Sequence, residues 1–248
     1  MTHLTSKALF ALMFAFPSLS SFASTRSQLQ TKAEQTDFVE TGRYDEVEKL
    51  CGDFQKHYPN KVRCFEYGKT SENRPMLAMA IGGQRSQLLP SRSDRTVVAF
   101  QGGIHAGEID GKDAGFWFIR DVLERKVLPD VLNKVTLLFI PVFNVDGHER
   151  FAAYSRPNQS GPIESGWRVT AQNYNLNRDY LKIDAPEMKA MIALLNEWNP
   201  ILYADLHVTD GAKFQQDIAV MIEPSNAGPA KLRDVAAKLS ERTMKNLT

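Results

Sequence analysis

The sequence predicts an α/β fold in which a mixed, mostly parallel sheet lies between two layers of helices. Three continuous apolar runs, at residues 96–101, 135–143 and 201–208, are typical of strands that are buried on both faces. Segments with helical periodicity lie between these runs along the chain. Strands that alternate with helices in this way are typical of a parallel sheet with helices on its faces.

The individual elements follow from local patterns. Apolar residues recur with a helical period at residues 44–58, and Pro59-Asn60 ends this helix. Gly102-Gly103 ends the first buried strand. The expected elements are, in chain order, a helix at 44–58, strands at 62–67, 76–81 and 96–101, a helix at 112–125, a strand at 135–143, a helix at 186–198, a strand at 201–208 and a terminal helix that contains Glu241.

The first 24 residues have the layout of a secretory signal peptide. Lys7 supplies a positive charge, a short apolar run follows at residues 8–19, and small residues at 21–23 offer a cleavage point. The apolar run is too short to span a bilayer, although an uncleaved anchor is an alternative. We therefore expect residues 1–24 to be removed and the mature protein to be exported, to the periplasm or the extracellular space.

The rest of the chain reads as a flexible lead-in and one domain. Residues 25–40 are polar and without a pattern, so we expect the folded domain to occupy residues 41–248. The formal net charge of +1 gives no electrostatic reason for binding to nucleic acid or to an anionic membrane. We expect neither as a partner once the signal is cleaved, and the sequence does not indicate an oligomeric state.

The two cysteines, Cys51 and Cys64, are close in sequence. In an oxidising compartment they could form a disulfide that ties a helix to the next strand. Two unpaired, buried thiols are the alternative. Neither cysteine lies in a C-x-x-C pair, so we place both outside the functional site.

Histidines and a glutamate at strand ends predict a metal site. His105 and His207 each lie at or just beyond the end of a predicted buried strand, where ligands collect in open α/β sheets. Glu108 follows His105 by three residues in a glycine-rich turn that lets both side chains converge. A catalytic zinc takes three protein ligands of this kind and keeps one position open. H-x-x-E alone is weak evidence, and a surface histidine with a capping glutamate is the alternative.

The long loop at residues 146–180 is polar and without periodicity, which in a compact domain is typical of a functional loop. Its arginines include Arg168 and Arg178, and Asn177 directly precedes Arg178. Arginine grips carboxylates or stabilises a developing oxyanion. A solvated surface charge is the alternative for any single arginine.

These motifs together resemble the zinc carboxypeptidases of the carboxypeptidase A type, from about Tyr44 to the end of the chain. The resemblance depends on five segments in the family's order: GGIHAGE at 102–108, NVDGHERF at 144–151, GWR at 166–168, NLNRDY at 175–180 and DLHVTDG at 205–211. The resemblance implies a carboxypeptidase-like three-layer α/β/α fold, a peptide substrate with a free C-terminal carboxylate, and one zinc ion per chain.

The resemblance also implies roles for individual residues. His105, Glu108 and His207 match the zinc ligands, and zinc would activate water and polarise the scissile carbonyl. Arg168 matches the residue that stabilises the tetrahedral oxyanion. Asn177 and Arg178 match the residues that hold the substrate's terminal carboxylate. The turn at Asn144, Asp146 and Gly147 also matches the family, and we interpret that turn as structural.

One part of the family's pattern has no match here. The general-base glutamate lies well downstream of the third ligand, and only 41 residues follow His207 (248 − 207). Neither Glu223 nor Glu241 stands in a matching context. We therefore expect a partial catalytic domain, incomplete at the C-terminus, with weakened zinc binding and peptidase activity close to nil. Two alternatives stay open: a zinc N-acyl-amino-acid deacylase related to aspartoacylase, and a non-catalytic secreted module that binds metal or peptide.

Overall fold

The structure, a computed structural model, describes residues 28–90, 96–157, 159–209 and 211–247. The expected signal peptide therefore lies outside the described residues. The chain divides into two compact units, Met1–Gly211 and Ala212–Thr248. Among the helices of the described residues, none has the length and apolar character needed to cross a membrane.

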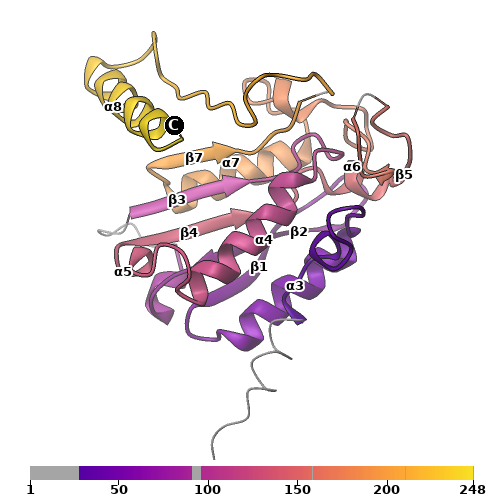
Figure 1. Cartoon of the computed structure of the whole chain (residues 1–248), viewed down its shortest axis with the longest axis horizontal. Helices are drawn as coiled ribbons and strands as arrows, with labels where there is room; N and C mark the ends of the chain where they lie inside the picture. The colour runs from indigo at the N-terminus through magenta and orange to yellow at the C-terminus, as the bar shows by residue number, and fades with distance from the viewer. Residues whose placement is uncertain (1–27, 91–95, 158, 210, 248) are drawn as a thin grey trace, which may run out of the picture. The chain divides into compact units, whose positions relative to one another are not determined.

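The first unit is built on a five-stranded mixed sheet (Figure 1). Its strand order is β1-β2-β4-β3-β7. The strands are β1 (Val62–Lys69), β2 (Pro75–Ile81), β3 (Thr96–Gln101), β4 (Val135–Ile140) and β7 (Leu202–Asp205). β3 pairs in parallel with both β4 and β7, whereas β1–β2 and β2–β4 are antiparallel.

The mixed sheet confirms the predicted fold class, although its parallel share is smaller than expected. β1 and β2 are joined by a short turn, and a connection of that length permits only antiparallel pairing. The two antiparallel pairs thus lie together on the β1 side of the sheet. The three parallel strands β3, β4 and β7 end at one edge, so the segments that follow them start close together.

Three long helices cover the two faces of this sheet (Figure 1). They are α3 (Tyr44–His57), α4 (Asp110–Leu123) and α7 (Pro186–Trp198). Phe54 of α3 stacks on Phe116 of α4, so these helices share a face. On β1, Cys64 is bonded to α3, whereas the neighbouring Phe65 stacks on Trp198 of α7. Because successive side chains of a strand point to opposite faces, α7 lies on the other side, which gives the three-layer arrangement.

Most predicted boundaries agree with the structure to within two residues. The last two strands are shorter than expected: β4 ends at Ile140, where Pro141 has no N–H to donate to the sheet, and β7 ends at Asp205. The shorter elements of the first unit are α2 (Lys32–Gln35), η1 (Arg85–Leu88), α5 (Val131–Lys134), α6 (Val145–Glu149), β5 (Ala152–Ala153), β6 (Glu164–Ser165) and η2 (Leu176–Arg178). The second unit contains α8 (Ala230–Leu247), in which only Ala236 is buried.

Cys51 and Cys64 form a disulfide, with their Cα atoms 5.4 Å apart. The bond joins α3 to β1, as one of the two predicted alternatives requires. Neither cysteine is among the residues of the metal centre described below. The disulfide is therefore a structural link between a helix and the edge strand that the helix covers.

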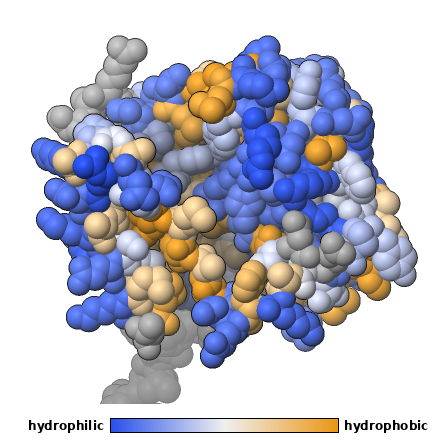
Figure 2. All heavy atoms as spheres, turned by 90° about the horizontal axis from the view of Figure 1, so that it is seen from above, coloured by the Kyte–Doolittle hydropathy of each residue, from blue (hydrophilic) through white to orange (hydrophobic). Residues whose placement is uncertain are grey.

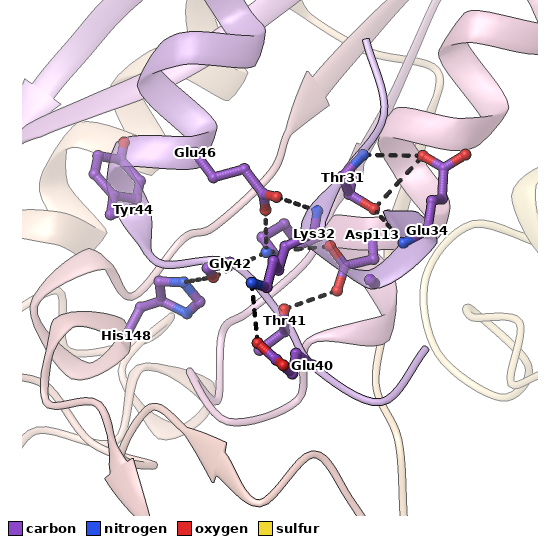
Figure 3. Close-up of polar contacts among 12 residues, drawn as sticks. Thr31, Lys32, Glu34, Glu40, Thr41, Gly42, Tyr44, Glu46, Asp113 and His148 are labelled. Carbon is purple, nitrogen blue, oxygen red and sulfur yellow. Dashed lines mark hydrogen bonds and ion pairs between the residues drawn. The ribbon is translucent and has the colours of Figure 1, made fainter. Parts of the chain in front are cut away.

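The N-terminal segment is a correction to the prediction of a flexible lead-in over residues 25–40. Residues 28–40 contain the short helix α2, whose first turn is closed by reciprocal hydrogen bonds between Thr31 and Glu34 (Figure 3). Glu34 also pairs with Arg120 of α4, a fully buried arginine that donates to the Leu29 carbonyl at 2.9 Å. The buried Leu29 and the ion pair of Glu34 hold this segment, which has too few apolar residues for periodicity to reveal it.

Candidate metal centre

The turn that follows β3 depends on two glycines. A Cβ on Gly102 would lie 2.8 Å from backbone atoms of Gly111, Lys112 and Pro141, so only glycine fits this close approach. Gly103 has a φ of +62°, a conformation that side chains disfavour. These two positions turn the chain out of the sheet and direct His105 and Glu108 toward the segment that follows β7.

His105, Glu108 and His207 meet at this edge, with one donor atom from each within 4.8 Å of the others. The Glu108 carboxylate lies between the rings: Oε1 is 2.8 Å from Nδ1 of His105, and Oε2 is 2.9 Å from Nδ1 of His207. His105 and Glu108 are buried, whereas the His207 side chain is 34% exposed. The arrangement thus keeps one ligand accessible from solvent.

The donor set fits zinc. Two imidazole nitrogens and one carboxylate are a common set for catalytic zinc. The far nitrogen of His207, Nε2, is 2.9 Å from Oδ2 of Asp205. Carboxylates in this position fix the tautomer and ring orientation of metal-binding histidines. The three residues would therefore hold a zinc ion through both Nδ1 atoms and the Glu108 carboxylate, with Asp205 behind His207.

The charges of these residues are strongly coupled. Burial alone would raise the pKa of Glu108, but hydrogen bonds with His105 and His207 outweigh burial and hold that pKa well below its usual range. Hydrogen bonds with Asp205 and Glu108 raise the pKa of His207 to about 9. Glu108 is consequently a carboxylate at neutral pH, the state that a metal ligand requires.

Two arginines of the long loop approach the same oxygen of Glu108. Nη1 of Arg168 is 3.7 Å from Oε1, and the Arg168 side chain is 34% exposed. Nη2 of Arg156 donates to Oε1 at 3.1 Å, and the Arg156 side chain is only 8% exposed. The sequence singled out Arg168 but missed Arg156. No local pattern distinguishes Arg156 from the other loop arginines.

No hydrogen bond of the described residues links the other two predicted residues to His105, Glu108 or His207. Asn177 and Arg178 lie in η2, where the hydrogen bonds described for them are local. The Asn177 amide donates to Oδ1 of Asn175 at 3.1 Å, and Nη1 of Arg178 donates to the Asn177 carbonyl at 2.8 Å. Their role in binding a substrate carboxylate stays a prediction.

The turn at Asn144, Asp146 and Gly147 has the structural character that the sequence indicated. Oδ1 of Asn144 accepts from the Gly147 amide at 3.0 Å, and Nδ2 of Asn144 donates to the Arg168 carbonyl at 3.2 Å. Asp146 is fully buried and accepts from Thr70 and Arg74. The turn therefore anchors the backbone of Arg168 beside the metal centre.

The fold and the donor set define an α/β protein with a candidate zinc centre at the carboxyl edge of its sheet. Comparison with known proteins identifies the family: the chain belongs to the zinc carboxypeptidase family, which matches residues 47–214. This is the peptidase family that the five sequence segments resembled.

Individual relatives match parts of the chain. Carboxypeptidase A6 of Mus musculus is 35% identical over 112 residues, which are 41% of this chain and 24% of that protein. The inactive metallocarboxypeptidase ECM14 of Saccharomyces cerevisiae is 30% identical over 98 residues, which are 38% of this chain and 22% of that protein. The match to these curated relatives thus spans about a quarter of their length.

Solved structures show the same fold. The crystal structure of thrombin activatable fibrinolysis inhibitor matches with a TM-score of 0.59 and 16% identity, covering 92% of this chain and 63% of that one. Carboxypeptidase A of Helicoverpa armigera matches with a TM-score of 0.54 and 19% identity, covering 77% of this chain and 53% of that one. At these identities the likeness supports the fold alone.

Proposed function

We propose that this chain carries the zinc centre of a metallocarboxypeptidase, which removes C-terminal residues from peptides. The single observation that carries the proposal is the convergence of His105, Glu108 and His207. Their donor atoms lie within 4.8 Å of one another although 102 positions (207 − 105) separate the first ligand from the last. Zinc bound there would supply Lewis-acid chemistry and activate water.

The protein's own residues would select and orient the substrate. Arg168 is partly exposed beside the centre and would donate to the oxygen on which charge develops during peptide hydrolysis. Asn177 and Arg178 would hold the terminal carboxylate of the peptide. A peptide without that carboxylate would leave these donors unpaired, which favours cleavage at the C-terminal residue.

Turnover by the 248-residue polypeptide is a separate matter from zinc binding. Neither Glu223 nor Glu241 stands in a context that matches the family's general base. One relative is itself named an inactive metallocarboxypeptidase, so family membership alone does not imply activity. We propose that this polypeptide binds zinc and peptide but hydrolyses peptides at a rate close to nil.

Export is also a proposal. It is supported by the signal-like pattern of residues 1–24 and by the Cys51–Cys64 disulfide, because disulfides persist in oxidising compartments. We propose that the mature protein acts in the periplasm or outside the cell.

Peptide binding to the zinc-loaded chain tests the proposed specificity. A peptide with a free C-terminal carboxylate is expected to bind more tightly than its C-terminally amidated form, and Arg178→Met should remove the difference. Arg125→Met, at an exposed arginine on the surface, is the matched control. Equal binding of the two peptides, or hydrolysis of N-acyl amino acids, would contradict a carboxypeptidase site.

A further inference from the structure

Arg156 donates a hydrogen bond to the candidate metal ligand Glu108 from outside the ligand set. Its Nη2 donates to Oε1 of Glu108 at 3.1 Å, and the side chain is almost entirely buried. None of the motifs that identify the family includes this residue. The buried guanidinium of Arg156 thus lies beside Glu108, which is itself a candidate ligand of a metal cation.

A bound metal ion would change the hydrogen-bond partners of Glu108. In the structure, Nδ1 of His105 faces Oε1 and Nδ1 of His207 faces Oε2. A metal ion would take the lone pairs of both Nδ1 atoms, so neither Nδ1 could then donate to the carboxylate. Two hydrogen-bond donors to the Glu108 carboxylate lie outside the two histidine rings. They are the Val208 backbone amide, 3.2 Å from Oε2, and Arg156, 3.1 Å from Oε1.

The loop is built to keep Arg156 in this position. A Cβ on Gly107 would lie 2.5 Å from Cγ of Arg156 and 2.6 Å from the Gly166 carbonyl. The stem of Arg156 therefore occupies the space that a side chain at position 107 would fill. The absence of a side chain at Gly107 therefore makes room for Arg156 beside the metal-binding turn.

We propose that Arg156 is a positioning residue of the metal centre, which holds the Glu108 carboxylate in its ligating orientation when the histidines have turned to the metal. This inference rests on the proposed zinc site. Arg168 differs, because its nearest nitrogen is 3.7 Å from the same oxygen and its side chain is more exposed. In this proposal Arg156 orients the metal ligand Glu108, whereas Arg168 contacts the peptide substrate.

An opposite outcome is physically reasonable, which makes the proposal testable. A guanidinium beside the centre repels a divalent cation, so a purely electrostatic effect would make metal binding tighter once the charge is removed. An orienting effect predicts weaker binding, since loss of a residue that orients a ligand typically costs about 10- to 100-fold in metal affinity. Weaker zinc binding after loss of Arg156 would therefore indicate an orienting effect, and tighter zinc binding would indicate a purely electrostatic effect.

The experiment is a zinc competition titration against a chromophoric chelator, on the whole chain. Arg156→Met is expected to raise the zinc dissociation constant about 10- to 100-fold. Two control variants remove the same charge elsewhere: Arg168→Met beside the metal centre, and Arg125→Met at an exposed surface position. Both should keep a zinc dissociation constant close to that of the wild type. An unchanged or tighter affinity in Arg156→Met would overturn the proposal. Thermal unfolding of the metal-free variants establishes that they fold.

Cobalt absorption provides a second readout of ligand geometry. Arg156→Lys keeps the charge but lacks the planar fork of arginine, so the cobalt spectrum of this variant should shift even where Arg156→Met fails to fold. A spectrum and affinity identical to the wild type in Arg156→Lys would overturn the proposal in that case. If the wild type itself binds no zinc, the proposed metal centre fails together with this inference. If the wild type binds zinc and the Arg156 variants bind it with the same affinity and the same cobalt spectrum, the inference alone fails.

Discussion

At the scale of single residues, the metal centre depends on groups that the sequence could indicate only in part. His105, Glu108 and His207 were predictable because each stands at a strand end or in a glycine-rich turn. Arg156 was not, because the loop that carries it has no period and its contact with Glu108 exists only in the folded chain. His148 lies in the segment that was predicted as a polar loop, yet it is buried and lies near two carbonyl groups.

The shape of the metal-binding turn gives the first prediction. Gly107→Ala places a methyl group within 2.6 Å of the Gly166 carbonyl and displaces the stem of Arg156. We expect this variant to lose about 1–3 kcal/mol of unfolding free energy by overpacking, and to bind zinc more weakly. Denaturant unfolding and zinc titration measure the two effects.

Gly52→Ala is the matched control for Gly107→Ala. Gly52 lies in α3, where an added Cβ meets nothing within 4 Å. That substitution should leave zinc binding unchanged and stabilise the helix by about 0.5–1 kcal/mol. Equal effects of the two substitutions would show that crowding at the turn is unimportant.

His148 gives the second prediction, on pH. Its Nε2 lies 3.2 Å from the Gly42 carbonyl (Figure 3). Its Nδ1 lies 3.3 Å from the Ala106 carbonyl, and the Gly42 carbonyl also accepts from Lys112. Burial, and then the charge of Lys112, lower the pKa of His148 to about 4, against the charges of its neighbour Glu149 and the two carbonyls. The ring is therefore neutral at physiological pH.

The sign of the effect follows from proton linkage. Between pH 6.5 and 4 the unfolded chain binds a proton on His148 that the folded chain does not, so stability falls as the pH falls through this window. The whole shift corresponds to about 3 kcal/mol. Urea unfolding from pH 7 to pH 4 should show a smaller loss in His148→Gln than in the wild type. Parallel curves for the two proteins would refute the assignment.

At the scale of elements, the prediction from sequence was best where one face or both faces are apolar. The strand at 96–101 and the helix at 186–198 were predicted at their observed bounds, because continuous apolar runs and the helical period mark them directly. The segment at 28–40 was missed because a single core leucine, Leu29, and a buried ion pair, Arg120 with Glu34, hold it. Sequence periodicity carries no signal for such a contact.

That ion pair gives the third prediction. Glu34→Gln removes the charge that compensates Arg120, whose side chain is fully buried. Breaking one partner of a buried pair costs about 3–5 kcal/mol, because the remaining charge is left without compensation in a low-dielectric environment. We expect a loss of that order in unfolding free energy. Glu40→Gln, in the exposed pair with Lys32, should cost less than about 1 kcal/mol.

The disulfide gives the fourth prediction. Cys51 and Cys64 are 13 residues apart, and closing a loop of about 15 residues stabilises a protein by roughly 3 kcal/mol in the chain-entropy account. The double variant with serine at both positions should lose stability of that order without losing zinc. A loss of zinc in the double variant would show that the link between α3 and β1 also shapes the metal centre.

At the scale of the whole molecule, the two units differ in how they are stabilised. The first unit contains the sheet, both helical layers and the metal centre. In the described part of the second unit, large apolar side chains such as Phe214, Ile218 and Met221 are exposed. Figure 2 shows apolar patches among the polar residues of one face. The described core and the proposed chemistry therefore belong to the first unit.

The most direct test of the account is the zinc content of the purified chain after dialysis, measured by elemental analysis. We predict one zinc ion per chain in the wild type and in His57→Ala, a histidine whose described hydrogen bond is to the Asp53 carbonyl of the same helix. His207→Ala should retain little zinc, because it leaves only two of the three ligands. A wild type without stoichiometric zinc, or a His207→Ala variant with the full amount, would contradict the account.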